Sequence, residues 1–178
     1  MSYLYTLCAV LPCMVILGWQ DCKYRKLPNV MTLGLGGIAL IARLLTGGFP
    51  GLLDGVLGGL VCGAFLLIPF MMKSAGGGDV KMLFAAGVIT GFRFAFAELL
   101  FVSLSGLLVG VVMLCCGRVA FARLRHYLRI VFDWRYDRRK GAAELPSKSD
   151  ERTRIPFGVA IAAGTVITLL YAYYLERM

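Results

Sequence analysis

The sequence is poor in the groups from which metal sites and nucleophilic triads are built. It has one histidine, and none of its six cysteines forms a C-x-x-C pair. The common zinc sites need several such ligands at short spacing, so we expect no metal and no cofactor. His, Cys and Ser residues do not gather in a pattern typical of nucleophilic catalysis. Any chemistry therefore depends on other side chains.

Charge is also scarce, which excludes an ordinary soluble domain. Charged residues make up 16% of the chain, against about 25% in soluble domains. Hydrophobic residues make up 59%, and the mean hydropathy is +0.77. The length of 178 residues suggests a single domain. The composition predicts an all-α, polytopic membrane protein in which residues 1–178 form one domain.

The net charge of +9 is unevenly distributed. Of the 19 Lys and Arg residues, 16 lie in three stretches, 23–26, 73–81 and 118–154. A net positive charge can indicate nucleic-acid binding. Here, however, the order of the apolar segments places all three basic stretches on one side of a membrane. We therefore expect basic cytoplasmic loops, both chain termini outside, and no nucleic-acid partner.

Apolar runs separated by glycine, proline and charged residues predict six transmembrane helices. The fourth is short for a full crossing, because about 13 residues rise only about 19 Å as a helix. Gly55-x-x-x-Gly59 and Gly59-x-x-x-Gly63 predict close helix packing in the third span. We expect Glu98 and Arg43 at the outer interface. The expected spans are residues 2–19, 30–46, 51–72, 80–92, 94–116 and 155–175.

Residues 117–154 form the one long polar stretch and precede the last span. Basic residues alternate with apolar ones over 118–140. This pattern is typical of an amphipathic helix that lies on an anionic membrane surface. The fold prediction is thus six transmembrane helices with a basic amphipathic cytoplasmic segment before the last one, in contact with anionic lipids of the inner leaflet.

Two aspartates come at the inner ends of predicted spans. Asp21 closes the first span, and Asp79 opens the fourth directly after three glycines, 76–78. Glycines permit close approach of another backbone. An acid at the mouth of a span is costly and marks a functional candidate, although Asp79 could equally serve as a helix N-cap. Asp54 falls on the outer side, and we interpret it as a helix-start or packing residue.

Asp21 and Asp79 would act together if they met in a partly dehydrated cleft. Two such carboxylates cannot easily both ionise, so they share one proton as a coupled pair. One then removes a proton from water while the other polarises a peptide carbonyl, as in an aspartic peptidase. The alternative is a non-catalytic membrane scaffold or a small proton-coupled transporter. A transporter would more naturally place its ionisable residues near mid-membrane.

Three motifs in chain order resemble those of the type IV prepilin peptidases, which are intramembrane aspartic proteases of the G-x-G-D class. The resemblance implies that Asp21 and Asp79 are the catalytic pair, and that Gly76 and Gly78 shape the loop that joins them. Lys81, Pro28, Asn29, Pro156 and Gly158 would be supporting positions. The motifs are Asp21 with the basic loop and Leu27-Pro28-Asn29, then Gly76-x-Gly78-Asp79-x-Lys81, then Ile155-Pro156-Phe157-Gly158.

The resemblance also implies a bacterial inner-membrane enzyme that removes the short basic leader of prepilins or pseudopilins on the cytoplasmic side. Larger members of the family also N-methylate the new N-terminus, and their first cytoplasmic loop often carries paired C-x-x-C motifs. Here that loop has only about ten residues. The chain is therefore more similar to the short, peptidase-only branch of tight-adherence (Flp-type) pili. Residues 117–154 are long for that branch, and we interpret them as a membrane-lying helix or a contact for pilus or secretion assembly components.

Replacing Phe121, Leu128 and Phe132 with Ser should weaken the lipid contact of residues 118–140, because it removes the apolar face that such a helix buries in lipid. An environment-sensitive fluorophore near Trp134 should report lipid in the unmodified protein and water in the triple variant. A fluorophore that already reports water in the unmodified protein would contradict the membrane-lying helix.

Overall fold

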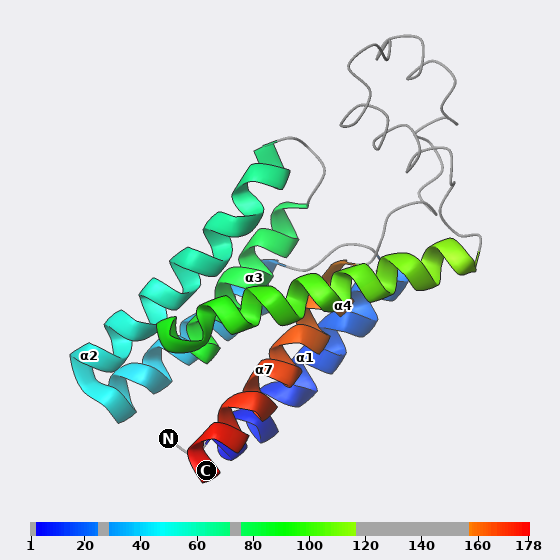
Figure 1. Cartoon of the computed structure of the whole chain (residues 1–178). Helices are drawn as coiled ribbons and strands as arrows, with labels where there is room; N and C mark the ends of the chain where they lie inside the picture. The colour runs from blue at the N-terminus through cyan, green and yellow to red at the C-terminus, as the bar shows by residue number, and fades with distance from the viewer. Residues whose placement is uncertain (1–2, 25–28, 72–75, 117–156) are drawn as a thin grey trace, which may run out of the picture. The chain divides into compact units, whose positions relative to one another are not determined.

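The computed structural model describes residues 3–24, 29–71, 76–116 and 157–178, and all of its regular structure is helical (Figure 1). The chain divides into two compact units, of which the first holds residues 1–107 and 156–178 and the second holds residues 108–155. Within the described ranges no strand occurs, so the all-α expectation is confirmed there. The elements are α1 (Tyr3–Tyr24), α2 (Asn29–Met71), α3 (Gly77–Thr90), η1 (Phe92–Phe94), α4 (Ala95–Cys115) and α7 (Phe157–Arg177).

Three of these helical stretches are long and apolar enough to cross a membrane. They are Val30–Met71 within α2, Phe92–Cys115, and Phe157–Arg177, and a shorter apolar stretch lies at Cys8–Asp21 in α1. A membrane protein is therefore confirmed, whereas six separate crossings remain a prediction. The expected surface segment, residues 117–154, lies outside the described residues.

A backbone break divides α2 into a first limb, residues 29–47, and a second limb, residues 49–71. Gly48 has φ 59° and ψ −154°, a conformation that glycine adopts without a side-chain penalty. The chain reverses there, as Figure 1 shows. The two limbs correspond to the second and third expected spans, and the break falls in the glycine–proline turn between them.

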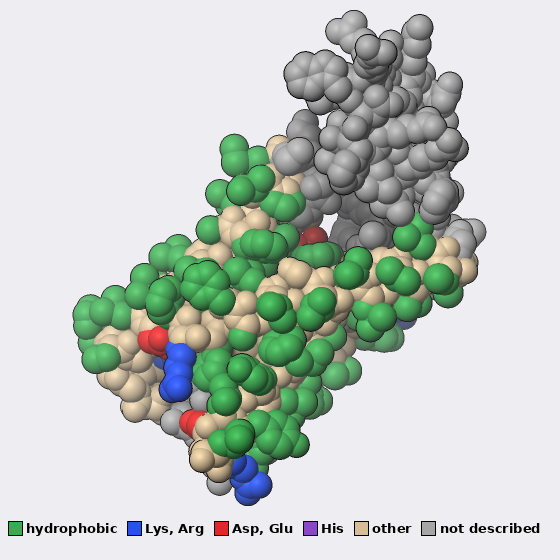
Figure 2. Space-filling model, in the orientation of Figure 1, with side chains coloured by type: hydrophobic (Ala, Val, Ile, Leu, Met, Phe, Trp, Pro, Cys, Tyr) green, Lys and Arg blue, Asp and Glu red, His purple; other side chains and the backbone are tan. Residues whose placement is uncertain are grey.

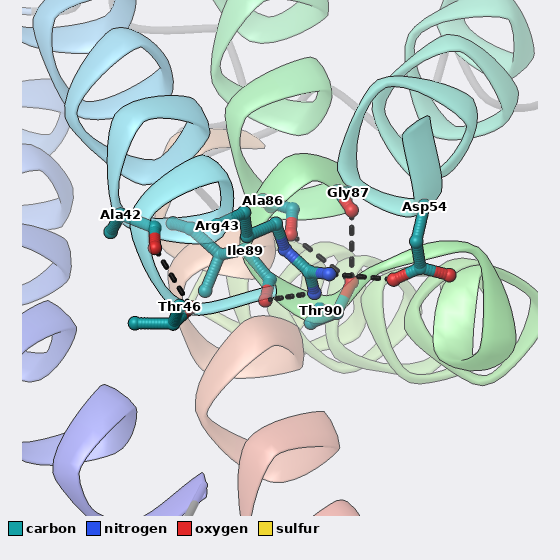
Figure 3. Close-up of polar contacts among 8 residues, drawn as sticks. All are labelled: Ala42, Arg43, Thr46, Asp54, Ala86, Gly87, Ile89 and Thr90. Atoms are coloured by element: carbon teal, nitrogen blue, oxygen red, sulfur yellow. Dashed lines mark hydrogen bonds and ion pairs between the residues drawn. The ribbon is translucent and has the colours of Figure 1, made fainter. Parts of the chain in front are cut away.

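An ion pair closes the turn between the two limbs (Figure 3). Arg43 Nη1 lies 2.6 Å from Asp54 Oδ2, and Arg43 Nη2 donates to the carbonyl of Ile89 at 3.0 Å. In a straight helix, 11 residues would separate Arg43 from Asp54 by about 16 Å. That Arg43 lies at the outer interface stays a prediction. Its guanidinium joins both limbs to the last turn of α3, and Asp54, expected to start a helix or to pack, forms the ion pair.

Glycines let the second limb of α2 lie close against α3, which is the most extensive helix contact in the described part of the chain. A Cβ added to Gly59 would lie 2.7 Å from Val88 Cγ2, and one added to Gly63 would lie 3.4 Å from Phe84 Cβ. In lipid the hydrophobic effect does not drive helices together, so close packing between them supplies much of the free energy of association. The two expected small-residue motifs are thus packing surfaces.

Large apolar side chains cover the outside of the helices as well as the core. Figure 2 shows hydrophobic side chains across the visible face, with few charged ones among them. Ile38, Phe96 and Leu107 are each more than half exposed, whereas Met14, Met82 and Leu169 are fully buried. In water such an exterior would be unstable, but in a bilayer it faces lipid chains.

Arg43→Ala and Asp54→Ala should each lower the free energy of unfolding, and the double variant should lose less than the sum. Because both side chains are partly exposed, we expect a coupling of about 0.5–1.5 kcal/mol. Unfolding in mixed micelles, measured for all three variants, gives this quantity. Strictly additive losses would show that the ion pair does not hold the turn.

Candidate active site

Asp21 lies in the last turn of α1 and is held by another helix. Its side chain is 6% exposed, and its Oδ2 atom accepts a hydrogen bond of 2.7 Å from the backbone N–H of Gly158. Gly158 is the second residue of α7. The first N–H groups of a helix have no partner within the helix, and they carry partial positive charge. The start of α7 is therefore a binding site for the Asp21 carboxylate.

The absence of a side chain at Gly158 makes this contact possible. An added Cβ would lie 2.8 Å from Asp21 Oδ2 and 3.0 Å from Asp21 Cγ. One turn earlier on α1, a Cβ at Gly18 would lie 3.7 Å from Ala162 Cβ of α7. The two helices thus approach closely where the acid docks. The sequence marks Gly158 only as a supporting position, and its role as a donor was missed.

Asp79 is the third residue of α3, and its carboxylate turns back to the start of its own helix. The backbone N–H of Gly76 donates to Asp79 Oδ2 at 3.1 Å, and the N–H of Asp79 donates to the Gly76 carbonyl at 3.1 Å. Asp79 is partly exposed. The helix begins at Gly77, before the expected start at residue 80. Asp79 therefore stabilises the start of α3, which agrees with the alternative that it caps the helix. It does so as the third residue of the helix and not as the N-cap residue itself.

Gly76 and Gly77, two of the glycines before Asp79, make close contacts and have no positive φ angle. Gly76 has φ −82° and ψ 147°, an ordinary extended conformation. A Cβ added there would lie 3.1 Å from Asp79 Oδ2, and one added to Gly77 would lie 3.4 Å from the Phe70 ring of α2. Gly78 lies in the first turn of α3. The segment from 76 to 79 is thus shaped by a carboxylate folded onto its own backbone.

The other expected positions have mixed outcomes. Lys81 lies in α3 and is partly buried, and Asn29 is the first residue of α2. Pro28 and Pro156 lie outside the described residues. The positions of these residues do not indicate a chemical role for any of them, so their supporting roles remain predictions.

Helix α7 contacts the helices that carry both aspartates. It packs against α1 and also against α3. Asp21 is bound directly to its N-terminal turn. The predicted meeting of the two carboxylates remains a prediction, but the two helices that bear them share this neighbour.

Glu98, expected at the interface, is instead fully buried. It lies in the first turn of α4 with 0% exposure, and Oε1 lies 2.7 Å from Thr165 Oγ1 of α7. The interfacial prediction was therefore wrong. The sequence around an acid at the end of an apolar run does not distinguish between two positions. The acid can face the lipid headgroups, or it can contact a polar side chain of another helix.

Gly158→Ala should destabilise the docking of α1 on α7, because the new methyl group overlaps the Asp21 carboxylate. We expect a loss of about 1–3 kcal/mol in the free energy of unfolding. Gly34→Ala is the matched control, since Gly34 is also helical and a Cβ there meets nothing within 4 Å. Equal stability of the two variants would contradict the close contact.

A comparison with protein families supplies independent information on this chain. Residues 8–114 match the type IV leader peptidase family, and this range includes Asp21, Asp79 and the glycines before Asp79. The start of α7 lies beyond the matched range. No curated protein and no solved structure matches the chain. Because the match covers more than half of the sequence, the chain belongs to the type IV leader peptidase family.

Proposed function

We propose that this prepilin-type membrane peptidase is an aspartic endopeptidase in which Asp21 and Asp79 are the catalytic pair. The single observation that carries the assignment is the hydrogen bond between Asp21 and the start of α7. A buried carboxylate that is held by a helix N-terminus is costly to build and has a fixed position. Family membership adds that peptide cleavage is the expected chemistry.

The two carboxylates have different surroundings, which suits a division of labour. Asp21 is buried and bound across helices, whereas Asp79 is partly exposed beside a glycine-rich segment. When they share a proton, the ionised acid takes a proton from water as the water attacks the peptide carbonyl. The protonated acid donates to the carbonyl oxygen, which stabilises the tetrahedral intermediate. No metal or covalent intermediate is needed.

The proposed substrates are prepilins or pseudopilins, whose short basic leader is removed at the cytoplasmic face of the bacterial inner membrane. The six expected crossings place Asp21, Asp79 and the basic loops on that face, with both termini outside. We propose peptidase activity without N-methylation. α1 ends at Tyr24 and α2 begins at Asn29, so the connection between them is too short to hold a methyl-donor domain.

The basic segment before the last helix is the proposed contact with anionic lipids of the inner leaflet, or with pilus or secretion assembly components. A scaffold or a small proton-coupled transporter is the competing function. It would use the aspartates for packing or proton coupling, and a scaffold would tolerate replacement of either aspartate. The placement of both aspartates at helix ends, rather than within a span, favours the peptidase.

Asp21→Asn and Asp79→Asn should each abolish leader removal, because an amide can neither accept the proton from water nor donate to the carbonyl oxygen as an acid does. We expect a loss of about 10²- to 10⁴-fold or more in rate. Co-expression with a prepilin, followed as a mobility shift on a gel, measures processing.

Glu176→Gln is the control, since it removes an exposed acid at the end of α7. Membrane insertion and thermal unfolding of each variant must match the unmodified protein. Normal processing by a folded Asp21→Asn or Asp79→Asn variant would remove that residue from the catalytic pair.

A further inference from the structure

Glu98 is a buried acid that the peptidase mechanism does not use. Its side chain has no exposure, and its Oε2 atom has no hydrogen-bond partner among the described residues. No described Lys or Arg forms an ion pair with it. An isolated carboxylate in such surroundings is very unfavourable, and in practice the group takes up a proton.

A count of hydrogens at Thr165 leads to the same conclusion. Thr165 Oγ1 lies 2.7 Å from Glu98 Oε1 and 2.8 Å from the carbonyl oxygen of Ile161. The carbonyl only accepts, and an ionised Glu98 would also only accept, yet the hydroxyl has a single hydrogen. A protonated Glu98 satisfies both contacts, because its O–H donates to Thr165 Oγ1 and the Thr165 hydroxyl then donates to Ile161.

The helices around this acid are tightly packed, so the contact has a fixed geometry. A Cβ added to Gly164 of α7 would lie 2.7 Å from Val102 Cα of α4. Cys62 of α2 lies against the start of α4, with its Sγ atom 3.8 Å from the Ala95 carbonyl oxygen. Both Cys62 and Val102 are fully buried. Glu98 is therefore enclosed by helices α2, α4 and α7.

We propose that Glu98 is a neutral carboxylic acid that donates a hydrogen bond to Thr165 and serves as a positioning residue for α7. Thr165 and Gly158 are seven residues apart, which is about two helical turns and the same face of α7. The hydrogen bond therefore fixes the helix whose first turn holds Asp21. The consequence for Asp21 rests on the proposed function, whereas the protonation of Glu98 does not.

Infrared difference spectra of the full chain in lipid nanodiscs test the protonation directly. Subtracting the spectrum of Glu98→Gln from that of the unmodified protein at neutral pH should leave a carboxylic-acid C=O stretching band. Thr165→Val should shift this band, because it removes the acceptor of the acid proton. Thr90→Val is the control, since Thr90 is equally buried and makes a similar bond to the Ala86 carbonyl. A carboxylate band in place of the acid band, or no shift in Thr165→Val, would overturn the proposal.

Prepilin processing by the same variants tests the positioning role. Glu98→Gln should retain the rate within about twofold, because the amide N–H donates in place of the acid. Glu98→Leu and Thr165→Val should each lower the rate by about two- to tenfold, through kcat rather than KM.

Equal rates for Glu98→Gln and Glu98→Leu would overturn the positioning role. If Asp21→Asn remained active, the aspartic mechanism would fail, but the infrared result on Glu98 would still stand by itself. The two failures are thus distinguishable.

Discussion

The hydrogen bond from Gly158 to Asp21 joins positions 137 residues apart and ties the end of α1 to the start of α7. It requires α1 to end against the first turn of α7. It also requires residue 158 to lack a side chain, because a Cβ there would overlap the carboxylate. When Asp21 is ionised, the positive end of the helix offsets the cost of burying its charge. One contact thus fixes both the chain path and the position of the acid.

Other polar side chains also join helices that are distant in the chain. Arg43 joins the two limbs of α2 to the last turn of α3, and Glu98 joins α4 to α7. Between these contacts the helices meet through glycines, as at Gly59 and Gly164. An apolar side chain has a similar free energy whether it faces lipid or another helix. Small residues and a few hydrogen bonds therefore specify which helix faces meet.

The helices were largely predictable from sequence, because each is a local apolar run that ends at glycine, proline or charge. The break at Gly48 and the short fourth helix are examples. Contacts between helices were not predictable, since the partners are distant in the chain. Glu98 was expected at the interface, yet it is buried against Thr165, and the sequence did not indicate that Arg43 binds Ile89. Asp21 and Asp79 were selected as candidates from their motifs, and their catalytic role stays a prediction. The partner of Asp21 on α7 gave no sequence signal beyond a glycine.

The pairing of Arg43 with Asp54 bears on how the protein is assembled. In the proposed topology the tip of α2 has to be carried across the bilayer when the chain is inserted. A lone Arg or Asp in the centre of a span costs about 2.5–3.5 kcal/mol. A helical hairpin that turns at Gly48 brings Arg43 and Asp54 together, so they can cross the bilayer as an ion pair with no net charge. The same ion pair that closes the turn would therefore lower the barrier to biogenesis.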